Sequence, residues 1–313
     1  MQILEFLNSI EKKTNSLVEE RGLAAIPHKE VVNKILNYCQ KQTCDLKAGD
    51  YKSFVVPHQI VKTIDIVENL EIEVNITDVT EDHSFNGSGM VSLKNHVGWN
   101  NNKIDYAKIV IKAYSYNGIL FDRAILSSLY HELNHLYDMW HDLSKTGNLS
   151  RIGKSLKKTG DIRRCVITND DDTNSLIYEI VYRLFSETEL NALISNVYGD
   201  LQGMKSIRKD FGGDLKKTKA YMIYNVLKKK LSSIYQEISR DEQQIIKLRT
   251  YLETNGIFLN PYGYSERAYL KEFVRKTTYL LRRLYKGIGR VASLYYDTIE
   301  FEYPDVVVKT KWS

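Results

Sequence analysis

The stretch SLYHELNHLYDMWH, residues 128–141, holds three of the chain's seven histidines and one glutamate. His131 and His135 are four positions apart, so on an α-helix their side chains lie on the same face, one turn apart. Two imidazoles in this arrangement can both bind one zinc ion at about 2.0–2.1 Å. Glu132 follows at about 100° around the helix, where its carboxylate can reach a water on the metal without binding the metal itself. The spacing therefore predicts a zinc site with a general base beside it, which is the chemistry of peptide hydrolysis.

The surroundings of this motif predict a long amphipathic helix. From Asp122 the apolar residues recur with a helical period, and we expect the helix to continue to about Leu143. One apolar stripe of this helix consists of Ile125, Leu129, Leu133, Tyr137 and Trp140. The alternative is a half-exposed helix whose histidines are only hydrogen-bonded, with no metal between them.

Two segments before this helix alternate between apolar and polar positions, which is the pattern of half-buried strands. They are LEIEVNITD, residues 70–78, and YAKIVIKAYS, residues 106–115, and the second ends at an Asn117-Gly118 turn. Between them, MVSL at residues 90–93 is a short strand candidate after a turn-rich loop. The polar face of the second segment indicates either a sheet edge or a solvated sheet surface.

Most of the remaining chain has helical patterns. Pro27 can begin the second of two helices expected within residues 1–47. A strong helix is expected at residues 175–198, ended by Gly199. Further helices are expected at about residues 214–239, 241–254 and 265–298. The last of them carries a continuous apolar seam formed by Leu270, Val274, Thr277, Leu281, Leu284, Ile288, Val291 and Tyr295.

The motif SLYHELNHLYD resembles the active-site helix of the zincin metallopeptidases, with uncharged residues on both sides of its core. In that superfamily a mixed sheet, one edge of which holds the substrate, precedes this helix. The resemblance covers about residues 55–200 and implies that His131 and His135 are zinc ligands and that Glu132 is the general base. The chain is also similar to zinc peptidases encoded by tailed phages.

The third zinc ligand separates the zincin subfamilies. His141 stands ten residues after His131, which is the metzincin offset, but Asp138 replaces the glycine that lets the metzincin chain turn back to the metal. If the helix continues, His141 lies about 240° past His135 and faces away. In the gluzincins the ligand is a glutamate from a later helix.

The expected helix at residues 175–198 offers three glutamates for this role. Glu179 and Glu187 each have Arg183 four residues away, which gives each a local ion pair. Glu189 has only apolar and small helical neighbours, and a carboxylate buried there needs a partner such as a metal. The segment ETELNA also resembles a stretch found in some gluzincin-like families. Glu189 is therefore the favoured third ligand, with Glu187 and His141 left open.

Charge and composition limit the partners that the chain can have. The net charge is +5, but residues 201–300 hold 20 Lys+Arg against 10 Asp+Glu. These charges fall on helices expected to have solvated faces, so nucleic acid is not expected as a partner despite the basic C-terminal third. No secretory signal and no long apolar run occurs, which predicts no membrane span and a cytoplasmic protein, or a virion or host-cell protein if a phage encodes it. The three cysteines are expected to be free thiols.

Together these patterns predict an α+β protein with a zincin-like small mixed sheet, an HExxH helix and a largely helical C-terminal region. The expected divisions are an N-terminal helical segment at 1–50, a zincin-like domain at 51–200 and a basic helical region at 201–313. The expected function is that of a zinc-dependent metalloendopeptidase acting on peptide or protein substrates. The alternative is a structural or interaction protein with a zincin fold and no turnover.

Overall fold

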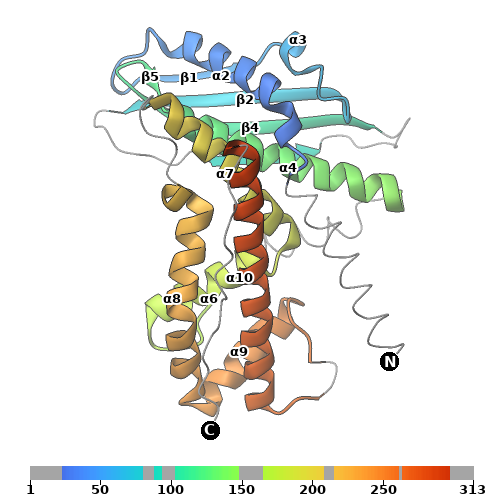
Figure 1. The fold of residues 1–313 in the computed structure, drawn as a ribbon, viewed down its shortest axis with the longest axis vertical. Coiled ribbons are helices and arrows are strands. Elements are labelled where there is room, and N and C mark those ends of the chain that lie inside the picture. Colours follow the sequence, from blue (N-terminus) through green and yellow to red (C-terminus); the bar gives the residue numbers. More distant parts are fainter. Residues whose placement is uncertain are drawn as a thin grey trace.

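The computed structural model describes residues 23–79, 88–93, 103–147, 165–207, 215–260 and 263–296. These residues form eight α-helices and one mixed sheet of five strands. Figure 1 shows the sheet with α2, α3 and α4 at one end of the molecule and the long helices α8 and α10 standing almost perpendicular to it. The expectation of a small mixed sheet followed by a mainly helical C-terminal part is confirmed.

The sheet has the strand order β1-β2-β4-β3, and a short β5 also pairs with β4. The strands are β1 Tyr51–Val55, β2 Val67–Val79, β3 Ser88–Leu93, β4 Ile104–Tyr116 and β5 Ile119–Leu120. The central strands β2 and β4 run parallel, and β3 pairs antiparallel with the other side of β4. Within the described residues, β3 is therefore an edge strand.

The position of β4 decides between the two interpretations of its polar face. Because β4 lies between β2 and β3, the interpretation as a sheet edge is wrong and the solvated surface is confirmed. Lys108 Nζ on this face forms ion pairs with Glu71 Oε1 at 2.6 Å and Glu73 Oε2 at 2.7 Å, both on β2. The lysine thus faces solvent and cross-strand partners, while Ile109 and Ile111 on the other face are fully buried.

A tight hairpin connects β4 to β5 immediately before the HExxH helix. Asn117 and Gly118 both have positive φ values, 49° and 75°, as a type I′ turn requires. The buried Asp78 accepts hydrogen bonds from both of their backbone N–H groups, at 3.1 and 2.8 Å, and from Ser115 Oγ at 2.7 Å. The turn is thereby fixed to the end of β2, which sets where the next helix begins.

The helix that carries the motif, α4, runs from Asp122 to Thr146 and ends at Gly147, whose φ is 68°. It is three residues longer than expected and is buried against the apolar face of the sheet. The helices α2, Lys29–Thr43, and α3, His58–Val61, belong to the same end of the molecule. As predicted, α2 follows Pro27, which lies in a 3₁₀ turn at Ile26–His28.

The second half of the described chain is helical. Its helices are α6 Asp171–Glu179, α7 Glu187–Ile207, α8 Lys219–Ser239, α9 Glu242–Thr254 and α10 Glu266–Tyr296, with a 3₁₀ turn at Leu215–Lys217. The three helices expected beyond residue 213 are confirmed to within a few residues. Every residue of the predicted α10 seam is buried except Tyr295, which is partly buried against the same core.

The single helix expected at residues 175–198 is wrong. After α6 the chain forms a π-helical turn, Ile180–Leu184, and then breaks before α7 begins at Glu187. Ser186 ends the break because its Oγ accepts a hydrogen bond from the Glu189 backbone N–H at 3.4 Å. The S-x-x-E pattern of residues 186–189 is a helix-start signal that the continuous apolar periodicity concealed.

Gly199 does not end α7, which continues to Ile207. A Cβ atom at Gly199 would lie 2.6 Å from the backbone oxygen of Leu126, and one at Gly203 would lie 2.4 Å from Arg123 Cα. Both glycines therefore let α7 pack directly against the backbone of α4. Their role is close helix–helix contact, and no left-handed cap is needed there.

The apolar side chains gather in two buried clusters, one drawn from residues 25–143 and the other from residues 165–291. Helix α7 runs without a break through the expected division at residue 200 and joins the two parts. Asp200 on α7 strengthens this junction, since it pairs with Arg123 Nε at 3.0 Å and accepts from the Lys219 N–H at 2.7 Å.

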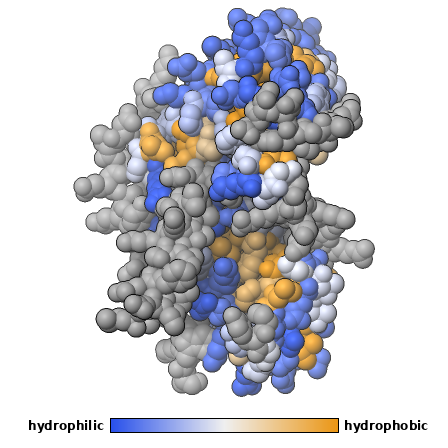
Figure 2. Space-filling view, turned by 90° about the vertical axis from the view of Figure 1, so that its right-hand side faces the viewer, coloured by the Kyte–Doolittle hydropathy of each residue, from blue (hydrophilic) through white to orange (hydrophobic). Residues whose placement is uncertain are grey.

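In the view of Figure 2 the sheet end of the molecule, at the top, is largely hydrophilic at its surface. This agrees with the charged outer face of β2 and β4. None of the described helices is both long and apolar enough to cross a membrane. Cys39, Cys44 and Cys165 are free thiols, as predicted.

Candidate metal centre

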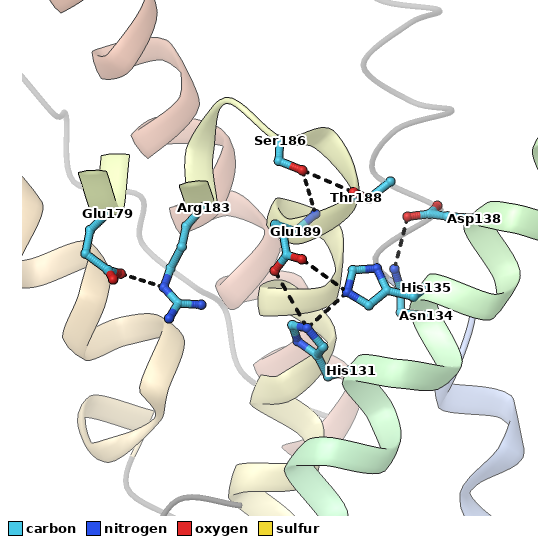
Figure 3. Close-up of polar contacts among 9 residues, drawn as sticks. All are labelled: His131, Asn134, His135, Asp138, Glu179, Arg183, Ser186, Thr188 and Glu189. Atoms are coloured by element: carbon cyan, nitrogen blue, oxygen red, sulfur yellow. Dashed lines mark hydrogen bonds and ion pairs between the residues drawn. The ribbon is translucent and has the colours of Figure 1, made fainter. Parts of the chain in front are cut away.

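Three predicted ligands converge where α4 meets α7 (Figure 3). His131 Nε2 lies 3.1 Å from His135 Nε2, with the two rings nearly perpendicular at 86°. The two oxygens of Glu189 lie 3.7 Å from His131 Nε2 and 3.5 Å from His135 Nε2. Each of the three residues offers one possible ligand atom, and these three atoms all lie within 4.8 Å of one another.

The local structure of α4 and α7 produces this convergence. The i, i+4 spacing places both imidazoles on the face of α4 that meets α7. Glu189 is in the first turn of α7, which Ser186 caps, and the break before Ser186 directs the chain toward α4. Further along, Ser195 Oγ donates to the backbone oxygen of Tyr130 at 3.0 Å and helps to hold the two helices in register.

Burial controls the protonation of all three side chains. It lowers the pKa of His135 to about 4, and it lowers the pKa of His131 well below the usual range with help from the nearby His135. Burial also raises the pKa of Glu189 to about 6. At pH 7 both imidazoles are therefore neutral and Glu189 is ionised, which is the protonation state that metal ligands need.

Two cations lie close enough to act on the same groups. The positive charges of Arg183 and Lys219 further lower the pKa of His131 and limit the increase in the pKa of Glu189. Arg183 Nε pairs with Glu179 Oε2 at 2.7 Å, as Figure 3 shows. The pKa of Lys219 is lowered, mainly by burial and then by the charge of Arg183. Both cations favour a neutral His131 and an ionised Glu189.

The donor set fits a zinc ion. Two imidazole nitrogens and one carboxylate oxygen are typical ligands of catalytic zinc, which keeps a fourth position open. Without a metal, the Nε2 atoms of His131 and His135 face each other at 3.1 Å and the Glu189 carboxylate at 3.5–3.7 Å. A cation held by the Nε2 atoms and Glu189 would satisfy the three facing groups together.

Glu132 is buried on the side of α4 that faces β3. A Cβ atom at Gly89 on β3 would lie 2.6 Å from Glu132 Cγ and 2.8 Å from Glu132 Oε1. Only a glycine leaves room for this carboxylate beside the strand. Burial raises the pKa of Tyr182 to about 12, and the charges of Glu189 and Glu132 contribute to the increase, so both carboxylates are close enough to act on this tyrosine.

Replacing Gly89 by valine is expected to reduce any hydrolytic activity by about 10²-fold while zinc binding is retained, because displacement of a catalytic group by about 1 Å has an effect of that size. The new side chain would push Glu132 out of its position without touching the three ligands. Met90→Val on the same strand is the matched control, since Met90 is 59% exposed. Kinetic assays and zinc analysis of both variants test this, and equal activity in Gly89→Val would contradict the placement of Glu132.

The other ligand candidates lie elsewhere. Glu187 Oε1 is 4.0 Å from Arg283 Nη2, so Glu187 has a cationic partner on α10. Arg183 lies in the π-helical turn Ile180–Leu184 and Glu187 begins α7, so the two residues do not share one continuous α-helix as expected. His141 is on the continuous part of α4, more than one turn past His135, and does not belong to the converging group.

Of the four remaining histidines, only two belong to the described residues. His28 Nε2 is hydrogen-bonded to the hydroxyl of Tyr137, and the two rings stack. His28 is thus a hydrogen-bonded histidine outside the converging group. His58 begins the short helix α3. His83 and His96 lie outside the described residues.

Sequence reasoning missed Gly89, Tyr182 and Asn196, all of which lie beside the predicted catalytic or ligand residues. Asn196 is within 3.2 Å of His131 Nδ1. Gly89 stands directly before the strand candidate MVSL, in a segment that the sequence predicts as a turn-rich loop. No local pattern connects Gly89 on β3 to Glu132 on α4, because only the folded sheet brings the two residues together.

Comparisons with protein-family models, with curated proteins and with solved structures found no match for this chain. What the centre can do therefore follows from its own residues and their geometry.

The centre makes the stability of the metal-free protein depend on pH. His135 has a folded-state pKa near 4 against an ordinary value of 6.5, so its contribution to stability is present above pH 6.5 and is lost as the pH falls toward 4. Glu189 acts in the opposite direction, because its pKa is raised from 4.5 to about 6. At 1.36 kcal/mol per pKa unit, the effect on the free energy of unfolding is about 3 kcal/mol for His135 and about 2 kcal/mol for Glu189. His131 acts in the same direction as His135.

We therefore expect the unfolding free energy of the metal-free protein to decrease between pH 6.5 and 4.5. Urea unfolding in the presence of a chelator measures it. In a His135→Leu variant, which cannot take up this proton, the decrease is expected to be smaller. An identical pH dependence in the two proteins would contradict the burial of a neutral His135.

Proposed function

We propose that this protein is a zinc-dependent hydrolase of peptide bonds. The observation that carries the proposal is the convergence of His131 Nε2, His135 Nε2 and the Glu189 carboxylate, with a further buried carboxylate, Glu132, one residue after the first histidine. This combination supplies three ligands and a separate proton acceptor. A purely structural zinc site would have a closed set of four ligands and would not need the additional carboxylate.

The residues of the centre have distinct roles in this proposal. When bound, zinc lowers the pKa of a coordinated water to about 7 and polarises the carbonyl group that is attacked. His131, His135 and Glu189 hold the metal. Glu132 accepts a proton from the attacking water and passes it to the leaving amine, which is general base and then general acid catalysis.

The edge strand β3 supports a peptide as the substrate. In the described part of the chain, β3 pairs with β4 on one side only, and Gly89 on this strand contacts the Glu132 side chain. A free strand edge offers backbone N–H and C=O groups to an extended peptide, which can add to the sheet as one more strand. A peptide bound in this way would pass beside the proposed general base.

The test is cleavage of a broad peptide library by the purified protein, with metal removed by a chelator and then restored with zinc. We expect cleavage that disappears with the chelator and returns with zinc. A protein that binds zinc but cleaves none of the peptides would contradict the proposal and favour the non-catalytic alternative. Cleavage that persists without metal would place the activity at another site.

A further inference from the structure

Asn196 contacts both a proposed metal ligand and the backbone of two helices. It lies on α7, seven residues or about two turns after Glu189, and only 3% of it is exposed. One terminal atom of its side-chain amide lies 3.0 Å from the backbone oxygen of Ser127, 3.1 Å from that of Ala192 and 3.2 Å from His131 Nδ1. A single amide atom therefore faces three groups.

The two carbonyl oxygens determine which amide atom this is. A carbonyl oxygen only accepts hydrogen bonds, so the atom between the two carbonyls is the amide nitrogen, whose two hydrogens are shared among Ser127 O, Ala192 O and His131 Nδ1. His131 Nδ1 thus faces a group that donates but cannot accept, so a proton on Nδ1 would have no acceptor there. The ring proton is on Nε2, where His135 Nε2 at 3.1 Å and Glu189 Oε2 at 3.7 Å are the facing acceptors.

This arrangement conflicts with metal binding at the same ring. A neutral imidazole that binds a metal through Nε2 carries its proton on Nδ1, and that N–H needs an acceptor. The amide nitrogen of Asn196 cannot accept it. Rotation of the amide by about 180° places its oxygen there, which satisfies Nδ1–H but gives up the hydrogen bonds to Ser127 and Ala192.

We propose that Asn196 selects the tautomer of His131 and that its amide turns over when the centre takes up a metal. In the metal-free protein the amide nitrogen holds the proton of His131 on Nε2. In the metal-loaded protein the amide oxygen accepts from Nδ1–H and orients the ring. Asn196 is thus a positioning residue. It opposes metal entry, and once the metal is bound it orients the His131 ring. The metal-loaded orientation of the amide rests on the proposed function, whereas the metal-free orientation does not.

The tautomer of His131 can be observed by nitrogen NMR of the histidine side chains, with a His131→Gln variant to assign the signal. We expect the Nε2–H form in the metal-free wild type and the Nδ1–H form after addition of zinc. In Asn196→Asp the carboxylate only accepts, so the Nδ1–H form is expected even without metal, with zinc affinity about 10-fold higher. Ser195→Ala removes a neighbouring helix–helix hydrogen bond and is expected to leave the tautomer unchanged.

An Nδ1–H form in the metal-free wild type, or the same metal-free tautomer in wild type and Asn196→Asp, would overturn the inference. If the buried aspartate prevents folding, Asn196→Ala serves instead, because loss of the N–H donor is expected to leave a mixture of both tautomers. If the His131 tautomer changes in the Asn196 variants but the protein binds no zinc, the metal-free assignment is supported and the proposed function is contradicted. The two failures are therefore distinguishable.

Discussion

Replacement of Glu132 by glutamine is expected to lower peptide hydrolysis by about 10³–10⁴-fold, at the upper end of what general acid–base catalysis contributes. Glutamine has the same shape and fits the space beside Gly89, but its amide cannot accept the proton of the attacking water. Because Glu132 is not among the three converging ligand residues, zinc content is expected to stay unchanged. Kinetic assays on a cleaved peptide and metal analysis of the same sample measure the two effects separately.

Glu187→Gln is the matched control for this variant. Glu187 is also a glutamate beside the centre, yet its carboxylate lies 4.0 Å from Arg283 and outside the converging group. We expect it to keep nearly full activity. Equal activity in Glu132→Gln and wild type would show that the hydrolysis takes place elsewhere or by another mechanism.

The second large effect concerns the third ligand. Glu189→Ala removes one of three proposed zinc ligands, so zinc affinity is expected to fall by more than the about 10–100-fold typical of residues that only support a ligand. The variant is not expected to unfold for electrostatic reasons, because the pKa of about 6 shows that the buried carboxylate is already unfavourable when ionised. Zinc titration against a competing chelator measures the change.

Two alanine variants serve as controls for this result. Glu187→Ala and His141→Ala replace the other ligand candidates and are expected to keep zinc affinity within a few fold of wild type. Loss of zinc in His141→Ala with retention in Glu189→Ala would mean that α4 breaks near Asp138 when metal binds. Loss in Glu187→Ala alone would leave the class of site unchanged and show that the wrong glutamate was chosen.

The local part of this site was predictable from sequence. His131, Glu132 and His135 belong to one helix, and helical periodicity alone places their side chains. The helices at 219–239, 242–254 and 266–296 were predictable for the same reason. Glu189 was favoured because its helical neighbours offer no counter-charge, and this argument needs only residues within one turn.

The rest depends on contacts between distant segments. The position of β4 inside the sheet follows from pairing with β2, which no pattern within residues 104–116 encodes. Gly199 has the sequence context of a helix end, but the close approach of α4 gives it another role. Gly89 and Asn196 act on Glu132 and His131 only after folding brings them together. Such residues become visible once packing is known.

The central claim is that α4 and α7 form a zinc centre, and metal analysis of the purified protein tests it most directly. We predict close to one zinc per chain in the wild type and almost none in the variant with both His131 and His135 replaced by alanine. Both proteins must be shown to be folded, for example by circular dichroism. Stoichiometric zinc in the folded double variant, or none in wild type after addition of zinc, would contradict the claim.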